Sequence, residues 1–195
     1  MAINSPSAAQ RTSLSKWATT LLVAMAHVNM ACAAAVGTIT ELTAPASVER
    51  SNGTLKGSTG VGIEMQDAVS TTLGKVSITF RDDSMVEVND HSRLEIDDFV
   101  FDPSKPSVGK LALGFAQGTV KYASGAIAHT DPNKVDLQTP SATIAVRGTD
   151  FTATTDETGA STIILLPSCP KKWVDIDRDC KTGAIDVYNL SLIHI

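Results

Sequence analysis

The chain has 195 residues, of which 19% are charged and 5% aromatic, and its formal net charge is −5. This length is enough for one domain with a buried core, and the composition is ordinary for a folded chain and low in charge for a disordered one. Lysine and arginine are scattered through a net negative sequence. This excludes a non-specific nucleic-acid binder, because such proteins carry a basic stripe.

Residues 1–35 have the features of a secretory signal peptide. Arg11 and Lys16 form a positive region, and residues 17–26 (WATTLLVAMA) form an apolar one. Small residues at 31–35 offer cleavage sites. An uncleaved membrane anchor and a lipoprotein are the alternatives. We therefore expect a periplasmic or secreted protein with no transmembrane helix after cleavage.

Residues 36–74 are expected to form an N-terminal segment ahead of the main domain. Alternating apolar and polar residues predict a first strand over residues 36–48. Residues 50–62 are rich in glycine and serine and predict a loop or hairpin turn. Residues 63–73 alternate weakly, which leaves a strand or a short helix open.

The clearest strand signal lies in residues 75–80 (KVSITF), where apolar residues take every second position. Two more short strands are expected at 85–88 and near 94–96, separated by polar turns. The acidic stretches Arg81–Asp83 and Asp97–Asp98 are interpreted as solvated loops. Short strands at this spacing are typical of a sandwich, a β-roll or a β-helix.

Strand patterns continue after a proline-containing loop at residues 97–109. Residues 110–122 alternate again, with a turn expected at Gln117–Gly118. A last hairpin is predicted from residues 151–155 and 161–166. A long helical period with caps is absent from the sequence after residue 35. The predicted fold is therefore all-β, built from short antiparallel strands and turns.

Residues 135–151 (VDLQTPSATIAVRGTDF) predict two short strands that are interrupted at Pro140 and Gly148. Arg147 and Asp150 flank the glycine. A charge-assisted pair between these two side chains would fix the corner. Such a pair explains both residues as structural, without a substrate.

The segment TPSATIAVRGTDF at residues 139–151 resembles the signature of FecR-type periplasmic domains. ITFRDDSMVEVNDHSRLEI at 78–96 and GTVKY at 118–122 are similar to earlier motifs of that family. The resemblance covers roughly residues 75–166 and implies an exported β-domain. The signature residues are Pro140, Arg147, Gly148, Thr149, Asp150 and Phe151.

The resemblance also carries functional expectations. Well-understood FecR regulators receive a signal from an outer-membrane transporter and control a sigma factor through a cytoplasmic segment. Only about sixteen residues precede the apolar segment here, too few for such a regulator. The resemblance thus implies an exported, non-catalytic binding or signalling module of the bacterial cell envelope that recognises a protein partner or an envelope polymer. A structural or surface component, calcium-assisted and truncated at its C-terminus, is the alternative class.

An enzyme is not expected from the sequence motifs. GxSxG, GxGxxG and GxxxxGK[ST] patterns are absent, and the four histidines are scattered. No catalytic residues and no cofactor other than calcium are therefore predicted.

Residues 167–189 are expected to form a C-terminal extension closed by a disulfide. Cys169 and Cys180 are the two cysteines that follow the predicted signal peptide, and an even pair in an exported chain favours a disulfide. It would contribute on the order of 2–3 kcal/mol. A two-thiol metal or redox site is the alternative, but the CxxC spacing is missing.

The same extension contains the acidic pattern of a calcium loop. Asp175, Asp177 and Asp179 alternate, and Asp186 stands at the twelfth position. Cys180 occupies the sixth position, where such loops need glycine. The alternative is a strand edge with a solvated acidic face.

Residues 190–195 (LSLIHI) do not continue the surrounding pattern. They match the translation of a transposon-end adaptor used for sequencing libraries. We expect this tail to be non-native, and the natural protein to continue beyond about Asn189.

Overall fold

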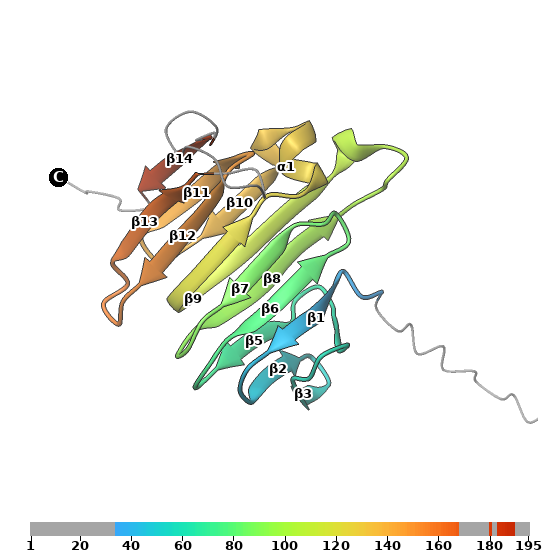
Figure 1. Ribbon diagram of the computed structural model, residues 1–195, viewed down its shortest axis with the longest axis vertical. Coiled ribbons are helices and arrows are strands. Elements are labelled where there is room, and N and C mark those ends of the chain that lie inside the picture. Colours follow the sequence, from blue (N-terminus) through green and yellow to red (C-terminus); the bar gives the residue numbers. More distant parts are fainter. Residues whose placement is uncertain (1–33, 168–179, 181–182, 190–195) are drawn as a thin grey trace, which may run out of the picture. The chain divides into compact units, whose positions relative to one another are not determined.

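The computed structural model describes residues 34–167, 180 and 183–189, and the regular structure of these residues is almost all β-strand (Figure 1). The all-β prediction is confirmed. The strands form one 14-stranded sheet with mainly antiparallel pairs. In chain order the elements are β1 (Gly37–Leu42), β2 (Ala46–Arg50), β3 (Gly53–Lys56), β4 (Gly62–Ile63), β5 (Ala68–Thr71), β6 (Val76–Phe80), β7 (Met85–Val88), β8 (Arg93–Val100), η1 (Pro106–Val108), β9 (Lys110–Ala123), α1 (Ala126–Thr130), η2 (Pro132–Lys134), β10 (Val135–Gln138), β11 (Ala142–Arg147), β12 (Asp150–Thr155), β13 (Ser161–Leu166) and β14 (Ala184–Asn189).

The long strand β9 divides this sheet into two layers. Its first half pairs with β8 and β10, in a layer that continues through β5, β2 and β3 on one side and β11 and β14 on the other. Its second half pairs with β7 and β12, in a layer that continues through β6, β1 and β4 and through β13. We call these layer B and layer A respectively. One strand thus passes from one layer to the other.

Gly118 marks the point where β9 changes layers. Its φ of +97° is rarely adopted by other residues, and a Cβ there would lie 2.1 Å from the Ser92 hydroxyl oxygen. The expected turn at Gln117–Gly118 is therefore wrong. The alternation does break at this point, but partners on both sides keep the chain extended as one strand.

A single apolar core receives side chains from both layers. Strand residues alternate between this core and solvent, which is the pattern that predicted the strands. In β11, for example, Ala142, Ile144 and Val146 are buried, and the residues between them are only partly buried. The predicted strands at residues 75–80 and 85–88 and the hairpin β12–β13 are confirmed.

Several boundaries differ from the sequence-based expectation. The first strand is two strands, β1 and β2, and residues 63–73 hold β4 and β5 without a helix. The predicted loop at residues 97–109 begins later, because β8 continues to Val100. Phe99 explains this extension, since it is buried and stacks on Phe80 with ring centroids 5.7 Å apart.

The connection from β9 to β10 contains α1 and produces a parallel pair between these two strands. Parallel neighbours need such a crossover. Ile127 and Ala128 of α1 are buried against the core. In the part of the chain that the structure covers, no helix has the length and apolar character needed to cross a bilayer.

Candidate functional site

The signature segment forms the corner at which the chain leaves layer B and enters layer A. Gly148, between β11 and β12, has a φ of +63°, so it supplies the left-handed conformation of this corner. The next residue, Thr149, is buried beneath Gly183, where a Cβ would lie only 2.4 Å from the Thr149 Cβ. The corner is therefore closely packed against the chain that leads into β14.

The expected pair between Arg147 and Asp150 is wrong. Arg147 donates from Nε to Asp186 of β14 at 2.7 Å, with a second hydrogen bond from Nη2. This partner raises the pKa of Arg147. Asp150 instead accepts a hydrogen bond from the Ser124 backbone N–H at 3.1 Å. The corner explains the difference, because Arg147 ends a strand of layer B and Asp150 begins a strand of layer A.

Asp82 lies in the acidic turn that was interpreted as solvated, and this interpretation is wrong for Asp82. Its side chain is buried and accepts hydrogen bonds from the Ser84 backbone N–H at 3.2 Å and the Ser84 hydroxyl at 2.6 Å. It also accepts from the Ile127 backbone N–H of α1 at 3.3 Å. Gly125 allows this approach, since a Cβ there would lie 2.3 Å from the Ser84 nitrogen. Asp82 therefore anchors α1 to the β6–β7 turn.

The aromatic residue of the signature completes the core beside this anchor. Phe151 packs on Tyr122 with ring centroids 5.4 Å apart, and both side chains are buried. Burial, with a smaller contribution from the Asp82 charge, raises the pKa of Tyr122. The phenol is thus neutral at physiological pH and fills space in the core.

The first part of the signature connects the two layers at the end of the β12–β13 hairpin. Ser161 of β13 donates to the Thr139 hydroxyl at 2.9 Å and accepts from the Ser141 hydroxyl at 3.0 Å. Pro140 packs against the hairpin turn at Gly159. Each of the six signature residues thus has a structural contact, and Pro140 also lines a surface cleft on layer B.

A buried ion pair near the N-terminal strands was not predicted. Arg50 donates to both carboxylate oxygens of Asp67, at 2.8 and 2.7 Å, and also pairs with Glu64. Asp67 is buried and further accepts from the Glu64 backbone N–H. The sequence signal was weak, because Arg50 opens a glycine- and serine-rich stretch that reads as a loop. This pair fixes the β2–β5 region and offers no open site.

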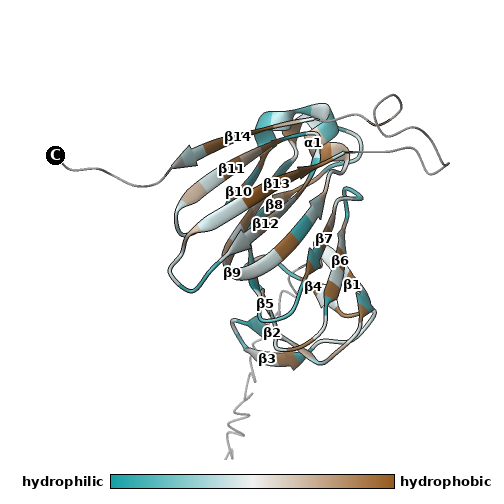
Figure 2. Cartoon of the chain, turned by 60° about the vertical axis from the view of Figure 1, so that its left-hand side comes forward, coloured by the Kyte–Doolittle hydropathy of each residue, from teal (hydrophilic) through white to brown (hydrophobic). Residues whose placement is uncertain are grey.

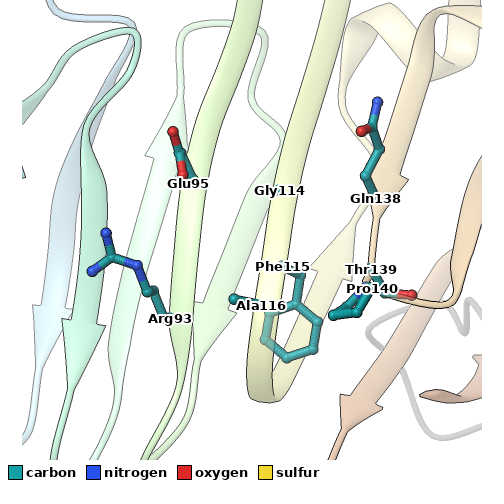
Figure 3. Close-up of a pocket in the computed structure, with 8 residues that line it drawn as sticks. All are labelled: Arg93, Glu95, Gly114, Phe115, Ala116, Gln138, Thr139 and Pro140. Atoms are coloured by element: carbon teal, nitrogen blue, oxygen red, sulfur yellow. The ribbon is translucent and has the colours of Figure 1, made fainter. Parts of the chain in front are cut away.

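One surface cleft of about 200 Å³ lies on the outer face of layer B (Figure 3). Gly114 and Ala116 of β9 form its floor, between Arg93 and Glu95 on one side and Gln138 on the other. Arg93 is held by Glu49 at 2.9 Å and by the Ser70 hydroxyl at 3.1 Å. We call this the Gly114 cleft. Its polar groups can form hydrogen bonds, but its lining residues contain no nucleophile paired with a general base.

Asp97 lies beside the Gly114 cleft on β8. Its carboxylate oxygen is 3.0 Å from the position that a Cβ on Gly114 would occupy, so it uses the space that the glycine leaves. Partial burial, with a further contribution from the Glu95 charge, raises the pKa of Asp97. Its neighbour Asp98 pairs with Lys110 at 2.9 Å.

Among the strands that the structure describes, four lie at an edge of a layer, and they differ in how they are protected. In layer B, β3 is short and carries Lys56, and β14 carries Asp186, which is paired with Arg147, beside the exposed Val187 and Tyr188. In layer A, β4 has only two residues. Short strands and charges are the usual protection against unwanted strand pairing.

The remaining edge strand, β13, lacks these protections. Its sequence STIILL has no charge, no proline and no glycine, and within the described ranges it pairs only with β12. Ile164 is 57% exposed and Leu165 is 39% exposed. Figure 2 shows the apolar colouring along this strand. We call the side of β13 that faces away from β12 the β13 edge.

Most residues of the predicted C-terminal sites lie outside the described residues. These are Cys169, Asp175, Asp177 and Asp179, so the disulfide to Cys180 and the calcium loop stay predictions. The signal segment up to residue 33 and the tail at 190–195 lie outside as well. Asp186 is described, and it is engaged with Arg147. Among the residues that the structure covers, no group of three or more histidine, cysteine or acidic side chains could hold a metal ion.

Comparison with known proteins agrees with the motif-based resemblance. The family model described as FecR protein matches residues 67–166, just over half of the 195-residue chain. The matched region begins at the buried Asp67 and includes Asp82 and the whole signature segment at 139–151. Neither the curated proteins nor the solved structures contain a significant match to the chain.

Proposed function

Because the chain belongs to the FecR family, we propose that it is an exported, non-catalytic binding and signalling module of the bacterial cell envelope that acts on a protein partner. Domains of this family generally serve signalling. The signal-like N-terminal sequence supports a periplasmic or secreted location.

The β13 edge is the observation that carries this proposal. An unpaired strand edge presents backbone N–H and C=O groups that can accept a further strand. Ile164 and Leu165 add apolar area on both faces of that edge. Burying such side chains stabilises a complex by roughly 25 cal/mol for each Å² of apolar surface removed from water. A strand supplied by a protein partner satisfies both requirements.

The non-catalytic part of the proposal is supported by the roles of the buried polar residues. Asp82 anchors α1, Asp67 binds Arg50, and Tyr122 fills the core. Each of these side chains is closed to solvent and is therefore out of reach of a substrate. The Gly114 cleft is open, but its chemistry suits hydrogen bonding.

Site-specific photo-cross-linking in intact cells tests the proposal. A photoreactive amino acid is placed at Ile164 of β13 or at Leu55 of the charged edge strand β3, which is similarly exposed at 40%. We expect a defined protein adduct from position 164 and none from position 55. Equal adducts from both positions, or retention on isolated cell wall without any protein adduct, would contradict a protein partner at the β13 edge.

Export is tested separately with the same cells. We expect the chain in the periplasmic or secreted fraction, with a new N-terminus after cleavage near residues 31–35. A full-length chain in the cytoplasm would contradict the proposed location.

A further inference from the structure

We infer that the strand that adds to the β13 edge is β13 of a second copy of this chain. This inference rests on the proposed function and names the partner for the same site. It is argued from the charge, the register and the surroundings of β13.

β13 has no charged side chain that would repel its own copy. A two-fold dimer brings the same surface of both copies together, so any charged side chain at its centre would meet a like charge. β13 has no charged residue, so the antiparallel self-pair brings no like charges into contact along its six residues.

Strand geometry restricts the register of this pair. Residues directly opposite each other point to the same face of a sheet. For layer A to continue into the second copy, even-numbered residues of β13 must therefore face even-numbered ones, and odd-numbered residues odd-numbered ones. Two central registers meet this condition, one centred on residue 163 and one on residue 164. The second places the most exposed side chain, Ile164, opposite Ile164 of the second copy, and we take this register. Ile163 then faces Leu165, and Thr162 faces Leu166. The Ile164–Ile164 pair covers the side chain that is 57% exposed. The Ile163–Leu165 pairs extend the inner apolar face.

The surroundings of β13 limit this association to two copies. Pro167 follows the strand directly and has no backbone N–H to donate, so the ladder stops there. A two-fold pair also occupies the β13 edge of both copies, which closes the assembly. The other edge of layer A is the two-residue β4, which is too short to continue the sheet.

The dimer is expected to be weak and concentration dependent. A pair of strands about 20 Å long buries less surface than the roughly 1,200–2,000 Å² of stable complexes. Association is therefore measured over a wide range of protein concentration, from about 1 to 500 µM, by sedimentation equilibrium on the purified full chain after export.

Cysteine cross-linking tests the register directly. Ile164→Cys places two Cβ atoms about 4.5–5.5 Å apart across the two-fold axis, close enough for a disulfide on mild oxidation. Thr162→Cys serves as the matched control, because residue 162 lies about 13 Å from its own copy in this register. The pair Thr162→Cys with Leu166→Cys should again cross-link. We expect cross-linked dimers from Ile164→Cys and from Thr162→Cys combined with Leu166→Cys, and monomer from Thr162→Cys alone.

Ile164→Lys provides an independent measurement. It should weaken dimerisation at least tenfold while leaving the unfolding midpoint of the monomer unchanged, because residue 164 is exposed. Leu55→Lys should leave dimerisation unchanged. A monomer at all concentrations, or equal cross-linking of Thr162→Cys and Ile164→Cys, would overturn the inference.

These outcomes separate the inference from the proposed function. A monomeric chain that cross-links to a different protein through position 164 overturns the second-copy inference and supports the proposed function. A monomeric chain without any protein adduct contradicts both. Dimers with the predicted register support the inference.

Discussion

The backbone N–H of Ile127 donates a hydrogen bond to the buried carboxylate of Asp82, and this contact joins residues that are 45 positions apart. It connects the β6–β7 turn to α1, which carries the crossover from β9 to β10. One buried carboxylate thus holds together an antiparallel and a parallel part of the fold.

Asp82→Asn is expected to destabilise the protein by about 2–3 kcal/mol, because the amide keeps only one acceptor oxygen and turns its N–H2 group towards either the Ser84 donors or the Ile127 N–H, which then lies buried without an acceptor. Asp83→Asn is the matched control. Asp83 is exposed and has a φ of +63°, which asparagine tolerates. Urea unfolding of both variants measures the difference. Equal stabilities would show that the Asp82 carboxylate contributes no more than a surface residue.

Gly118→Ala is expected to be more destabilising than Gly60→Ala. Both glycines have a φ near +90°, so both alanine variants carry a similar backbone strain of about 1–2 kcal/mol. A Cβ at residue 60 meets open space, whereas one at residue 118 overlaps Ser92. The midpoint of thermal unfolding should fall further for Gly118→Ala. A loss no greater than that of Gly60→Ala would mean that the layer change in β9 tolerates a side chain.

Asp97→Asn is expected to stabilise the protein at pH 7. The pKa of Asp97 is raised, so folding favours the protonated form. The free energy of unfolding is therefore larger when Asp97 is protonated. This stability is fully present below the unfolded-state pKa of about 4, and it is lost as the pH rises through the folded-state pKa. The advantage of Asp97→Asn should shrink towards pH 3.

Asp98→Asn is the control for this pH prediction, because Asp98 pairs with Lys110 and its loss removes a favourable contact. It should not stabilise the protein at pH 7. Thermal unfolding of both variants between pH 3 and pH 8 provides the comparison. A pH-independent gain for Asp97→Asn would indicate a cause other than ionisation.

Arg147→Gln tests the link between the ion pair with Asp186 and the predicted calcium loop. If Asp175, Asp177, Asp179 and Asp186 bind calcium, removing Arg147 frees a carboxylate and should strengthen calcium binding. The unfolding midpoint of the wild type should then rise with millimolar calcium, rise further in Arg147→Gln, and stay constant in Asp177→Asn. No calcium response in any variant would contradict the calcium loop.

The sequence predicted the strands well where their residues alternate. Alternation is a local property, because each side chain points to one face of its own strand. It was therefore enough to locate β6, β7 and the β12–β13 hairpin without any knowledge of tertiary contacts. The signature segment likewise identified the family.

The partners of polar residues were predicted poorly, because these partners come from distant parts of the chain. Asp82 and Asp83 look alike in the sequence, and only the return of α1 buries the first of them. Arg147 has Asp150 three residues away, yet the corner at Gly148 turns it towards Asp186 instead.

The sequence by itself determined the all-β class, the spacing of the strands and the family, because these depend on residue pattern and motif. Only the tertiary structure decided that β9 spans two layers and that β13 lies at an edge of the described sheet. Both features depend on which strands pair. Strands pair through backbone N–H and C=O groups, which are the same in nearly all residues, so the local sequence does not identify the partner strand.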